Sequence, residues 1–371
     1  NECLDEKHEA EYVVKKVLEH KRNGKTLADQ VVFYRVHAQS RVLEDALRKA
    51  NVPYKIVGGT RFYDRKEIKD LIAYLRVLVN PNDDVSLKRI LNVPARGIGK
   101  KALETLENEM IVNGQPNLDG VLSALESVKG ITPRAVKSLQ VFYFLIQSLR
   151  KEVSNLSVSE LLEQILGRTR YVEILQEEKT VEAQSRIENI EEFFSVIEDF
   201  EENFTTNEMS ESVPPLMAFL ESITLMTGLD TMEDGTNVLT MMSLHTAKGL
   251  EFPLVYMVGM EEGIFPNGKS YNDDPEDMEE ERRLCYVGMT RAKDKLHMTY
   301  ARQRRLYGAQ QHNLPSRFLN EIPSALFENS SMISSIAGGI DFADDFDDPL
   351  TDDDIIIDID DDEVKRRILF D

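Results

Sequence analysis

A single arginine follows a run of apolar and small residues, and its position suits the binding of a phosphate group. The run extends from Cys285 to Thr290, and Arg291 comes directly after it. A guanidinium group is planar and permanently charged, and its fork of N–H donors matches the oxygens of a phosphate. An amphipathic helix followed by a loop would not by itself explain this arginine. We therefore expect Arg291 to point at a phosphate.

A polar segment, Ser243–Phe252, lies between two runs that have the composition of buried strands. Four of its residues have polar side chains, His245, Thr246, Lys248 and Glu251, and Gly249 allows backbone conformations that other residues avoid. Ligands of α/β sheets bind in segments of this kind, where strands end. Without its neighbours, His245 would equally suit a hydrogen-bonded polar residue at the end of a strand. The segment as a whole indicates a ligand site.

A third segment has the pattern of a helix-hairpin-helix DNA contact. It reads Arg96-Gly97-Ile98-Gly99-Lys100, between two predicted helices. The glycines let the backbone approach a phosphate, and the next helix offers its N-terminal N–H groups. Such contacts do not depend on DNA sequence. A Gly-x-Gly turn can also simply join two helices, and Val128–Ala135 is a weaker second copy of the pattern.

A phosphate-binding loop of the Walker A type is not found in the sequence. Gly24-Lys25-Thr26 resembles its last residues, but the motif requires a glycine at position 19, where the chain has Glu19 within a predicted helix. No predicted strand ends in a paired Asp-Glu of the Walker B type. We expect that the chain alone does not hydrolyse ATP. The spacing of its cysteines and histidines predicts no metal site.

The periodicity of apolar residues predicts an α/β fold with a helical insertion. Helix and strand patterns alternate from Glu9 to Val57, only helical patterns follow from Ile68 to Met226, and strand patterns return at 238–242, 253–258 and 295–300. We expect one discontinuous sheet domain, residues 1–70 and 233–325. An all-α domain, residues 71–232, is expected to interrupt it.

The negative charge of the chain is concentrated in its last residues. The net charge is −22, and Asp341–Asp371 contains 14 acidic and three basic residues, a contribution of 3 − 14 = −11. Basic residues recur elsewhere in small groups, so the overall charge does not exclude a local contact with DNA. We expect residues 326–371 to form a disordered acidic tail. Its isoleucines, Ile355–Ile357 and Ile359, could instead anchor a protein partner.

Two segments, Ser243–Phe252 and Glu279–Ala292, resemble helicase motifs V and VI of the UvrD/PcrA/Rep-type superfamily 1 DNA helicases, most closely the PcrA and UvrD members. The stretch Gly259–Pro266 is similar to the GMEEGxFP segment of that family. Upstream, Phe33–Arg41 resembles its LYRxNAQSR segment, with His37 where the family usually has asparagine. The similarity extends from about Glu9 to Pro323. It implies the C-terminal half of the enzyme, with a RecA-like second motor domain of the P-loop NTPase class.

The resemblance also implies roles for individual residues. Arg291 would reach the γ-phosphate of ATP as an arginine finger. Glu251 would bind the ribose, and Lys248 and Gly249 would shape the same loop. Contacts with single-stranded DNA are implied for Arg35, His37, His245 and Thr246, and contacts with duplex DNA for the loop of Arg96, Gly97, Ile98, Gly99 and Lys100.

The implied cofactor is ATP with Mg²⁺, bound mostly by a first motor half that we expect upstream of Asn1. Partners would be single-stranded DNA, a duplex junction, that first half and a protein bound by the acidic tail. The two cysteines, Cys3 and Cys285, and the lack of an 18-residue apolar run favour a cytoplasmic protein without a membrane segment. The alternatives are a non-catalytic DNA- or partner-binding module and, less favoured, a helicase–nuclease fusion.

Overall fold

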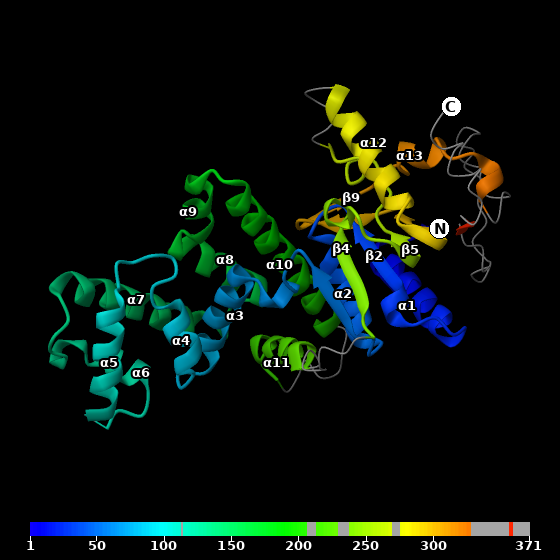
Figure 1. Cartoon of the computed structure of the whole chain (residues 1–371). Helices are drawn as coiled ribbons and strands as arrows, with labels where there is room; N and C mark the ends of the chain where they lie inside the picture. The colour runs from blue at the N-terminus through cyan, green and yellow to red at the C-terminus, as the bar shows by residue number, and fades with distance from the viewer. Residues whose placement is uncertain (113, 206–212, 229–236, 269–274, 328–355, 359–371) are drawn as a thin grey trace. The chain divides into compact units, whose positions relative to one another are not determined.

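The computed structural model of the chain describes residues 1–112, 114–205, 213–228, 237–268, 275–327 and 356–358 (Figure 1). The chain divides into two compact units. The first consists of Asn1–Arg61 and Thr231–Asp371, and we call it the sheet unit. The second, Phe62–Asp230, is the helical unit.

A parallel sheet organises the sheet unit (Figure 1). Its strands lie in the order β10-β6-β5-β2-β4-β3, and all but β10 run in the same direction. The parallel strands are β2 (Gln30–Tyr34), β3 (Tyr54–Val57), β4 (Leu239–Ser243), β5 (Phe252–Met257) and β6 (Ala292–Met298). The predicted α/β class and parallel sheet are therefore confirmed.

The two faces of the sheet carry separate apolar cores, because side chains alternate along each strand. Val32 and Tyr34 of β2 pack with helices α1 (Glu6–Arg22) and α2 (Gln39–Lys49). Val31 and Phe33 face the other way, into a core that includes residues of α12 (Pro275–Met289) and α13 (Arg317–Asn320). The sheet is thus covered by helices on both faces, as expected for parallel strands.

Two further pairs of short strands lie in the described part of the sheet unit. Strand β1 (Glu2–Cys3) runs parallel to β7 (Tyr300–Ala301), and β8 (Arg304–Leu306) forms a hairpin with β9 (Ala309–Gln311). The turn of that hairpin has positive φ at Tyr307 and Gly308. The unit also contains 3-10 turns: η1 (Leu27–Asp29), η6 (Leu244–Ala247) and η8 (Ser324–Leu326).

Strand β6 differs from the sequence prediction, which placed a strand at residues 295–300. The strand begins earlier, at Ala292, and Tyr300 belongs to β7. The residues at the start of the strand are charged, Lys293-Asp294-Lys295, so apolar alternation does not reveal where the strand begins. Backbone pairing of Ala292 with Phe252 sets the start of the strand instead.

The predicted disordered tail lies mostly outside the described residues. Within it, Ile356–Asp358 forms strand β10, which pairs antiparallel with β6. For these three residues the structure differs from the expected disorder, because the edge of β6 offers backbone hydrogen-bonding groups to an extended segment. Phe327, also placed in the tail, is buried in the core that contains α12.

In the described part of the helical unit, all regular elements are helices (Figure 1). They are η2 (Phe62–Asp64), α3 (Lys66–Val79), α4 (Asp84–Ile90), α5 (Lys100–Val112), α6 (Leu118–Ser123), η3 (Leu125–Ser127), α7 (Pro133–Glu152), α8 (Val158–Thr169), α9 (Tyr171–Glu178), α10 (Val181–Thr205) and α11 (Pro215–Gly228). Helix α3 packs against α4, α7, α8, α10 and α11, so it forms the centre of the unit.

The helical unit begins earlier than the predicted boundary at residue 71. Phe62, Tyr63 and Ile68 are buried in its single apolar core. The prediction followed the onset of helical periodicity, whereas core membership is decided by the partners of these side chains. No helix in the described part of the chain combines the length and apolar composition that crossing a membrane requires.

A pair of histidines, of which His20 is half-buried, joins α1 to the sheet. The Nε2 atoms of His20 and His297 are 3.1 Å apart, and the ring of Tyr256 stacks on His297 with centroids 4.9 Å apart. His297 is fully buried, and its Nδ1 has no partner within the described residues. Burial, and next the neighbouring His20, hold the pKa of His297 well below its usual value. The folded chain therefore keeps His297 neutral.

This pair predicts a stability that declines in mild acid. The unfolded chain takes up a proton near the ordinary histidine pKa of about 6.5, while folded His297 does not. The stabilisation is complete above that pH and is lost as the pH falls toward the lowered pKa. We expect His297→Gln to flatten the slope of unfolding free energy against pH by up to about 1.4 kcal/mol per unit between pH 6.5 and 5. Chemical denaturation at several pH values measures it.

The matched control is His312→Gln, at an exposed position of the same unit. It should leave the slope as in the parent chain. Equal slopes in the parent and in His297→Gln would contradict the assignment of a neutral buried imidazole.

Candidate functional site

The loops at the carboxyl ends of the parallel strands meet and bring two predicted DNA-contact segments together. A Cβ atom on Gly58, after β3, would lie 3.1 Å from the side chain of Thr246, after β4. A Cβ on Gly59 would lie 3.5 Å from Cε1 of His37, after β2. Gly58 also has a φ of +76°, so this turn needs glycine for both space and conformation. His37 and His245 are exposed at this carboxyl edge of the sheet.

Arg35, another predicted DNA contact, is engaged in an ion pair at the same edge. Its guanidinium donates to both carboxylate oxygens of Glu281 on α12, with an NH2–Oε1 distance of 2.6 Å. Glu281 also accepts from the backbone N–H of Asn267. The sequence analysis gave no role to Glu281, although it lies in the motif that ends at Arg291. Its carboxylate neutralises Arg35, so DNA would have to compete with it for this guanidinium.

Gln39 holds the backbone of the segment that carries Arg35. Its Oε1 accepts from the N–H groups of Arg35 and Val36, at 2.9 and 3.0 Å, and its Nε2 donates to the carbonyl of Val258. The side chain is buried. Gln39 is thus a positioning residue that the sequence analysis missed. The available signal was an amide-bearing residue at the start of a helix, directly after a strand end.

The environment of His245 favours its neutral form. Although the residue is exposed at the surface, partial desolvation of its ring, followed by the positive charge of Arg35, holds the pKa of His245 below its usual value, against the carboxylates of Glu281 and Glu280. A neutral imidazole can donate or accept a hydrogen bond but brings no charge to a phosphate. The geometry therefore suits a hydrogen-bonding role for His245.

Arg291 and Glu251 lie at the opposite, amino ends of β5 and β6. The guanidinium of Arg291 donates to the carbonyl oxygens of Val287 and Leu250 and to Oγ1 of Thr290. These partners, the ones found within the described residues, are all neutral oxygens. Arg291 therefore keeps an uncompensated positive charge, in contrast to Arg35.

Glu251 stands beside this arginine. Leu250 accepts a hydrogen bond from the side chain of Arg291, and the N–H of Phe252 donates to the Arg291 carbonyl at 2.9 Å. The carboxylate of Glu251 is half-exposed and lies 3.3 Å from Nζ of Lys293, a residue that the sequence analysis did not single out. Lys248 and Gly249 are exposed in the same loop, and a Cβ on Gly249 would meet open space. The structure thus brings these four predicted residues to one end of the sheet.

Two elements connect the two ends of the sheet. The segment after β4 runs from His245 at the carboxyl edge to Glu251 at the amino edge, and α12 runs from Glu281 to the residues before Arg291. They pack closely, since a Cβ on Gly288 would lie 2.5 Å from Cδ2 of Leu244. A shift of α12 would therefore be felt at both ends.

In the helical unit, the side chain of Arg96 does not point outward as the sequence predicted. Its NH1 donates to the carbonyl oxygens of Ile90, Leu91 and Val93, and its guanidinium lies over the ring of Phe142 at 5.0 Å. Arg96 thus stabilises its own loop. The resemblance implied a contact with duplex DNA for Arg96, whereas the carbonyl groups at and after the end of α4 hold its guanidinium within the loop.

The remaining residues of this loop differ in exposure. Gly97 and Gly99 are exposed, and the Lys100 side chain is 90% exposed at the start of α5. Ile98 is instead buried, and its N–H donates to Oδ1 of Asn92. The outer surface of the loop is therefore formed by glycine backbone and Lys100, while Ile98 anchors it.

The second Gly-bearing segment lies beside the first. A Cβ on Gly97 would be 4.0 Å from Nε of Arg134, and a Cβ on Gly130 would be 3.8 Å from Cγ2 of Thr105. Arg134 is exposed in the first turn of α7, and Thr132 caps that helix by accepting from the N–H of Ala135. The two segments thus present Lys100 and Arg134 on one surface.

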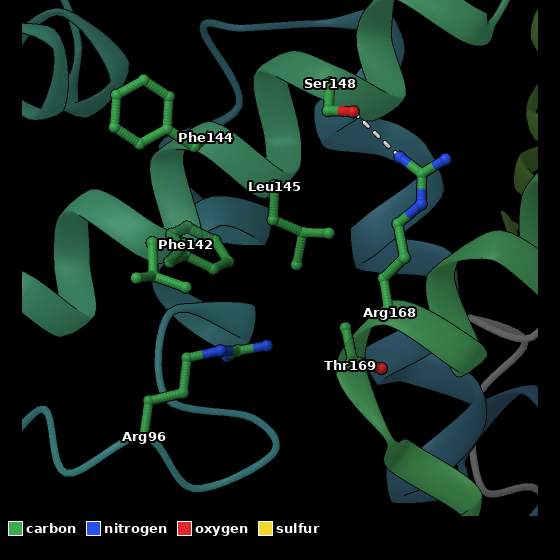
Figure 2. A pocket seen from close by; sticks show the side chains of 8 residues that line it. Arg96, Phe142, Phe144, Leu145, Ser148, Arg168 and Thr169 are labelled. Carbon is green, nitrogen blue, oxygen red and sulfur yellow. Dashed lines mark hydrogen bonds between the residues drawn. The ribbon is translucent and has the colours of Figure 1, made fainter.

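An open pocket of about 390 Å³ lies between α7, α8 and the loop of Arg96 (Figure 2). Figure 2 shows Arg96 and Arg168 on opposite walls, with Arg168 donating to Oγ of Ser148. Arg168 is also paired with Glu152, and the donors of Arg96 are directed at carbonyl groups. These guanidiniums are therefore engaged within the unit. Among the described residues, no cluster of histidine, cysteine and carboxylate side chains could hold a metal ion.

Comparison with known proteins gives a family for these segments. Residues 2–303 match the profile of the UvrD-like helicase C-terminal domain. The ATP-dependent DNA helicase PcrA of Staphylococcus aureus (strain Mu50 / ATCC 700699) is 45% identical over 331 residues, which cover 89% of this chain and 44% of the relative. PcrA of Staphylococcus epidermidis (strain ATCC 12228 / FDA PCI 1200) is 44% identical over 329 residues, 88% of this chain and 44% of the relative. The chain spans about half the length of these relatives.

The contact between Gly259 and Gln39 predicts a large cost for Gly259→Ala. The φ of Gly259 is +68°, and a Cβ there would lie 2.0 Å from Nε2 of Gln39. The substitution adds backbone strain of about 1–2 kcal/mol and displaces a buried amide whose hydrogen bonds contribute about 1–3 kcal/mol. We expect the unfolding free energy to fall by about 2–4 kcal/mol in urea titrations.

The matched control is Gly249→Ala, where φ is +83° but nothing lies within 4 Å of the added Cβ. It should show the backbone strain alone. Equal losses at the two positions would contradict the packing argument.

Proposed function

Because the chain belongs to the UvrD-like helicase family, through the C-terminal domain, we propose that it is the second, RecA-like motor half of an ATP-dependent DNA helicase. In this proposal the all-helical domain is inserted in the motor domain, and the helicase moves 3′ to 5′ on single-stranded DNA, as the resemblance implies. It would act in DNA repair or replication in the cytoplasm. The relatives named PcrA, which are ATP-dependent DNA helicases, support the activity.

The observation that carries the proposal is the uncompensated guanidinium of Arg291. Its described partners are neutral oxygens, whereas Arg35 is neutralised by Glu281. A structural arginine usually gains a carboxylate when it leaves bulk water. An arginine held by carbonyl groups keeps its charge for an incoming anion. This is what a γ-phosphate contact in phosphoryl transfer requires.

The residues around Arg291 fit part of an ATP site. Glu251 can accept hydrogen bonds from ribose hydroxyls, and the exposed loop of Lys248 and Gly249 leaves space beside it. ATP with Mg²⁺ would supply the phosphoryl group whose transfer drives movement. The carboxylates for Mg²⁺ and the phosphate loop are assigned to a first motor half. We therefore propose that this chain alone does not hydrolyse ATP.

The carboxyl edge of the sheet would carry the single-stranded DNA. His37, His245 and Thr246 lie at this edge, and Arg35 is paired there with Glu281. These residues would offer hydrogen bonds to DNA rather than a broad positive surface. Such contacts with phosphate and sugar hold a strand without reading its sequence. The segment from His245 to Glu251 would then couple the binding of single-stranded DNA to the binding of the nucleotide.

Duplex DNA would be held by the helical unit at the surface of Gly97, Gly99 and Lys100. Ile98 and Arg96 support this loop from inside, which changes the role proposed for Arg96 from contact to support. Arg134, beside Gly97, extends the surface by one positive charge. A protein bound by the acidic tail is a further proposed partner.

A non-catalytic DNA- or partner-binding module remains the alternative, and the ATPase test separates the two. In the protein that combines this chain with its first motor half, we expect Arg291→Ala to reduce the ATPase rate on the order of 10³-fold while nucleotide binding stays within a few-fold. A coupled phosphate-release assay and binding of a fluorescent ATP analogue measure the two quantities.

The matched control is Arg283→Ala, an exposed arginine on α12, the helix that precedes Arg291, which is paired with Glu280. It should leave turnover near that of the parent. An unchanged rate in Arg291→Ala would refute the phosphate contact, and a parent protein without ATPase activity would favour the binding module.

The helical unit predicts a separate effect on duplex binding. For the chain of residues 1–371, Lys100→Ala should weaken binding of a duplex oligonucleotide and lower the slope of log Kd against log salt by about 0.9, the value of one phosphate contact. Lys151→Ala, at an exposed position on α7, is the matched control. Fluorescence anisotropy at several salt concentrations measures the slopes, and equal slopes in the two variants would exclude this DNA contact.

A further inference from the structure

The β8–β9 hairpin packs against the segment that carries the proposed single-stranded DNA contacts. Leu306, at the end of β8, is buried together with Ala38 and Ile264, and Val36 and Tyr307 pack against this cluster. Val36 and Ala38 alternate along the chain with Arg35 and His37. The hairpin therefore packs against Val36 and Ala38, while His37 between them is exposed.

The base of the hairpin is fixed by a buried arginine. Arg304 is 3% exposed, and its guanidinium is bonded to the carboxylates of Glu9 on α1 and Glu261, with distances of 2.6 Å to each. Glu261 also accepts from the N–H of Ala301 at 2.8 Å. Removing the arginine would leave two carboxylates buried without their counter-charge, so the position of the hairpin is strongly determined.

A chain of hydrogen bonds and contacts leads from Arg304 to Arg35. Oε1 of Glu9 accepts from the backbone N–H of Gly259, at 2.9 Å. Gly259 packs directly against Gln39, whose Oε1 accepts from the N–H groups of Arg35 and Val36. Every side chain in this chain of contacts, from Arg304 to Gln39, is buried. The same segment is thus held by a polar route through Gln39 and an apolar route through Leu306.

We propose that the β8–β9 hairpin is the positioning element of the Arg35–His37 segment, so that grip on single-stranded DNA depends on Leu306 and Arg304, which touch no DNA. The DNA part of this inference rests on the proposed function. The turn at Tyr307 and Gly308, with φ of 54° and 73°, matches the type I′ geometry that fixes a two-residue hairpin. A rigid hairpin of this kind can transmit a displacement of its base to Val36 and Ala38.

The first experiment measures the positioning without using DNA. In Leu306→Val, hydrogen exchange of the amides of Arg35 and Val36 should become about tenfold faster, because the segment loses packing worth about 1.4 kcal/mol. Leu306→Met keeps the volume and should restore the parent rate. The matched control is Leu319→Val on α13. Leu319 is buried to a similar degree, but in the separate apolar core that contains residues of α12. Equal acceleration in the Leu306→Val and Leu319→Val chains would overturn the proposal.

The second experiment measures the consequence for DNA. Binding of an oligothymidylate to the chain of residues 1–371 should weaken about fivefold to tenfold in Leu306→Val and recover in Leu306→Met, while duplex binding stays unchanged. His245→Ala serves as a direct contact variant. If neither His245→Ala nor Leu306→Val weakens binding while exchange is still accelerated, positioning holds and the proposed DNA edge fails. If His245→Ala weakens binding and Leu306→Val does not, the hairpin has no role in DNA grip and the proposal is overturned.

Discussion

The pairing of β2 with β4 on one side and β5 on the other is the interaction on which the rest of the sheet unit depends. It brings segments from both sides of the helical unit into one sheet. Strands β3 and β4 are parallel neighbours, so the chain must cross from the carboxyl edge back to the amino edge between them. The helical unit occupies this crossover connection. The pairing of β3 with β4 constrains only where this crossover starts and ends.

The same pairing separates the proposed chemistry into two ends. The contacts assigned to DNA lie at the carboxyl edge, and Arg291 with Glu251 lies at the amino edge. The arginine at each edge of the sheet has a different charge environment. Glu281 neutralises Arg35, so grip on DNA would be modest and reversible, as a moving motor requires. Arg291 has only neutral oxygens as described partners, so in the proposed function it would keep its charge for a phosphate. Helix α12 carries Glu281, which lies at the carboxyl edge of the sheet, and leads to Arg291 at the amino edge. The helix packs on Leu244 through Gly288, so one rigid element joins the two edges.

The sequence allowed the α/β class and the strands to be predicted, since short, mostly apolar runs at β2 and β4 and helical spacing in α1 and α2 are direct signals of burial. It did not reveal the start of β6, because the charged residues there give no apolar pattern and backbone pairing defines the strand. Nor did it reveal the inward turn of Arg96, because a basic residue in a glycine loop reads as a surface residue until its carbonyl partners are known. Gln39 and Glu281 were missed for the same reason. Their roles consist of long-range partners, and no local pattern specifies those.

The buried group of Glu9, Arg304 and Glu261 shows why such partners are kept at all. Three charged side chains that are nearly inaccessible carry a desolvation cost that opposes their mutual attraction. Apolar residues of similar volume could stabilise the fold as well. They could not, however, accept from Gly259 N–H, Ala301 N–H and the hydroxyl of Thr299 at the same time. These bonds fix the loops after β5 and β6 in one arrangement. The group therefore holds the loop geometry to which the Arg35–His37 segment is connected through Gly259 and Gln39.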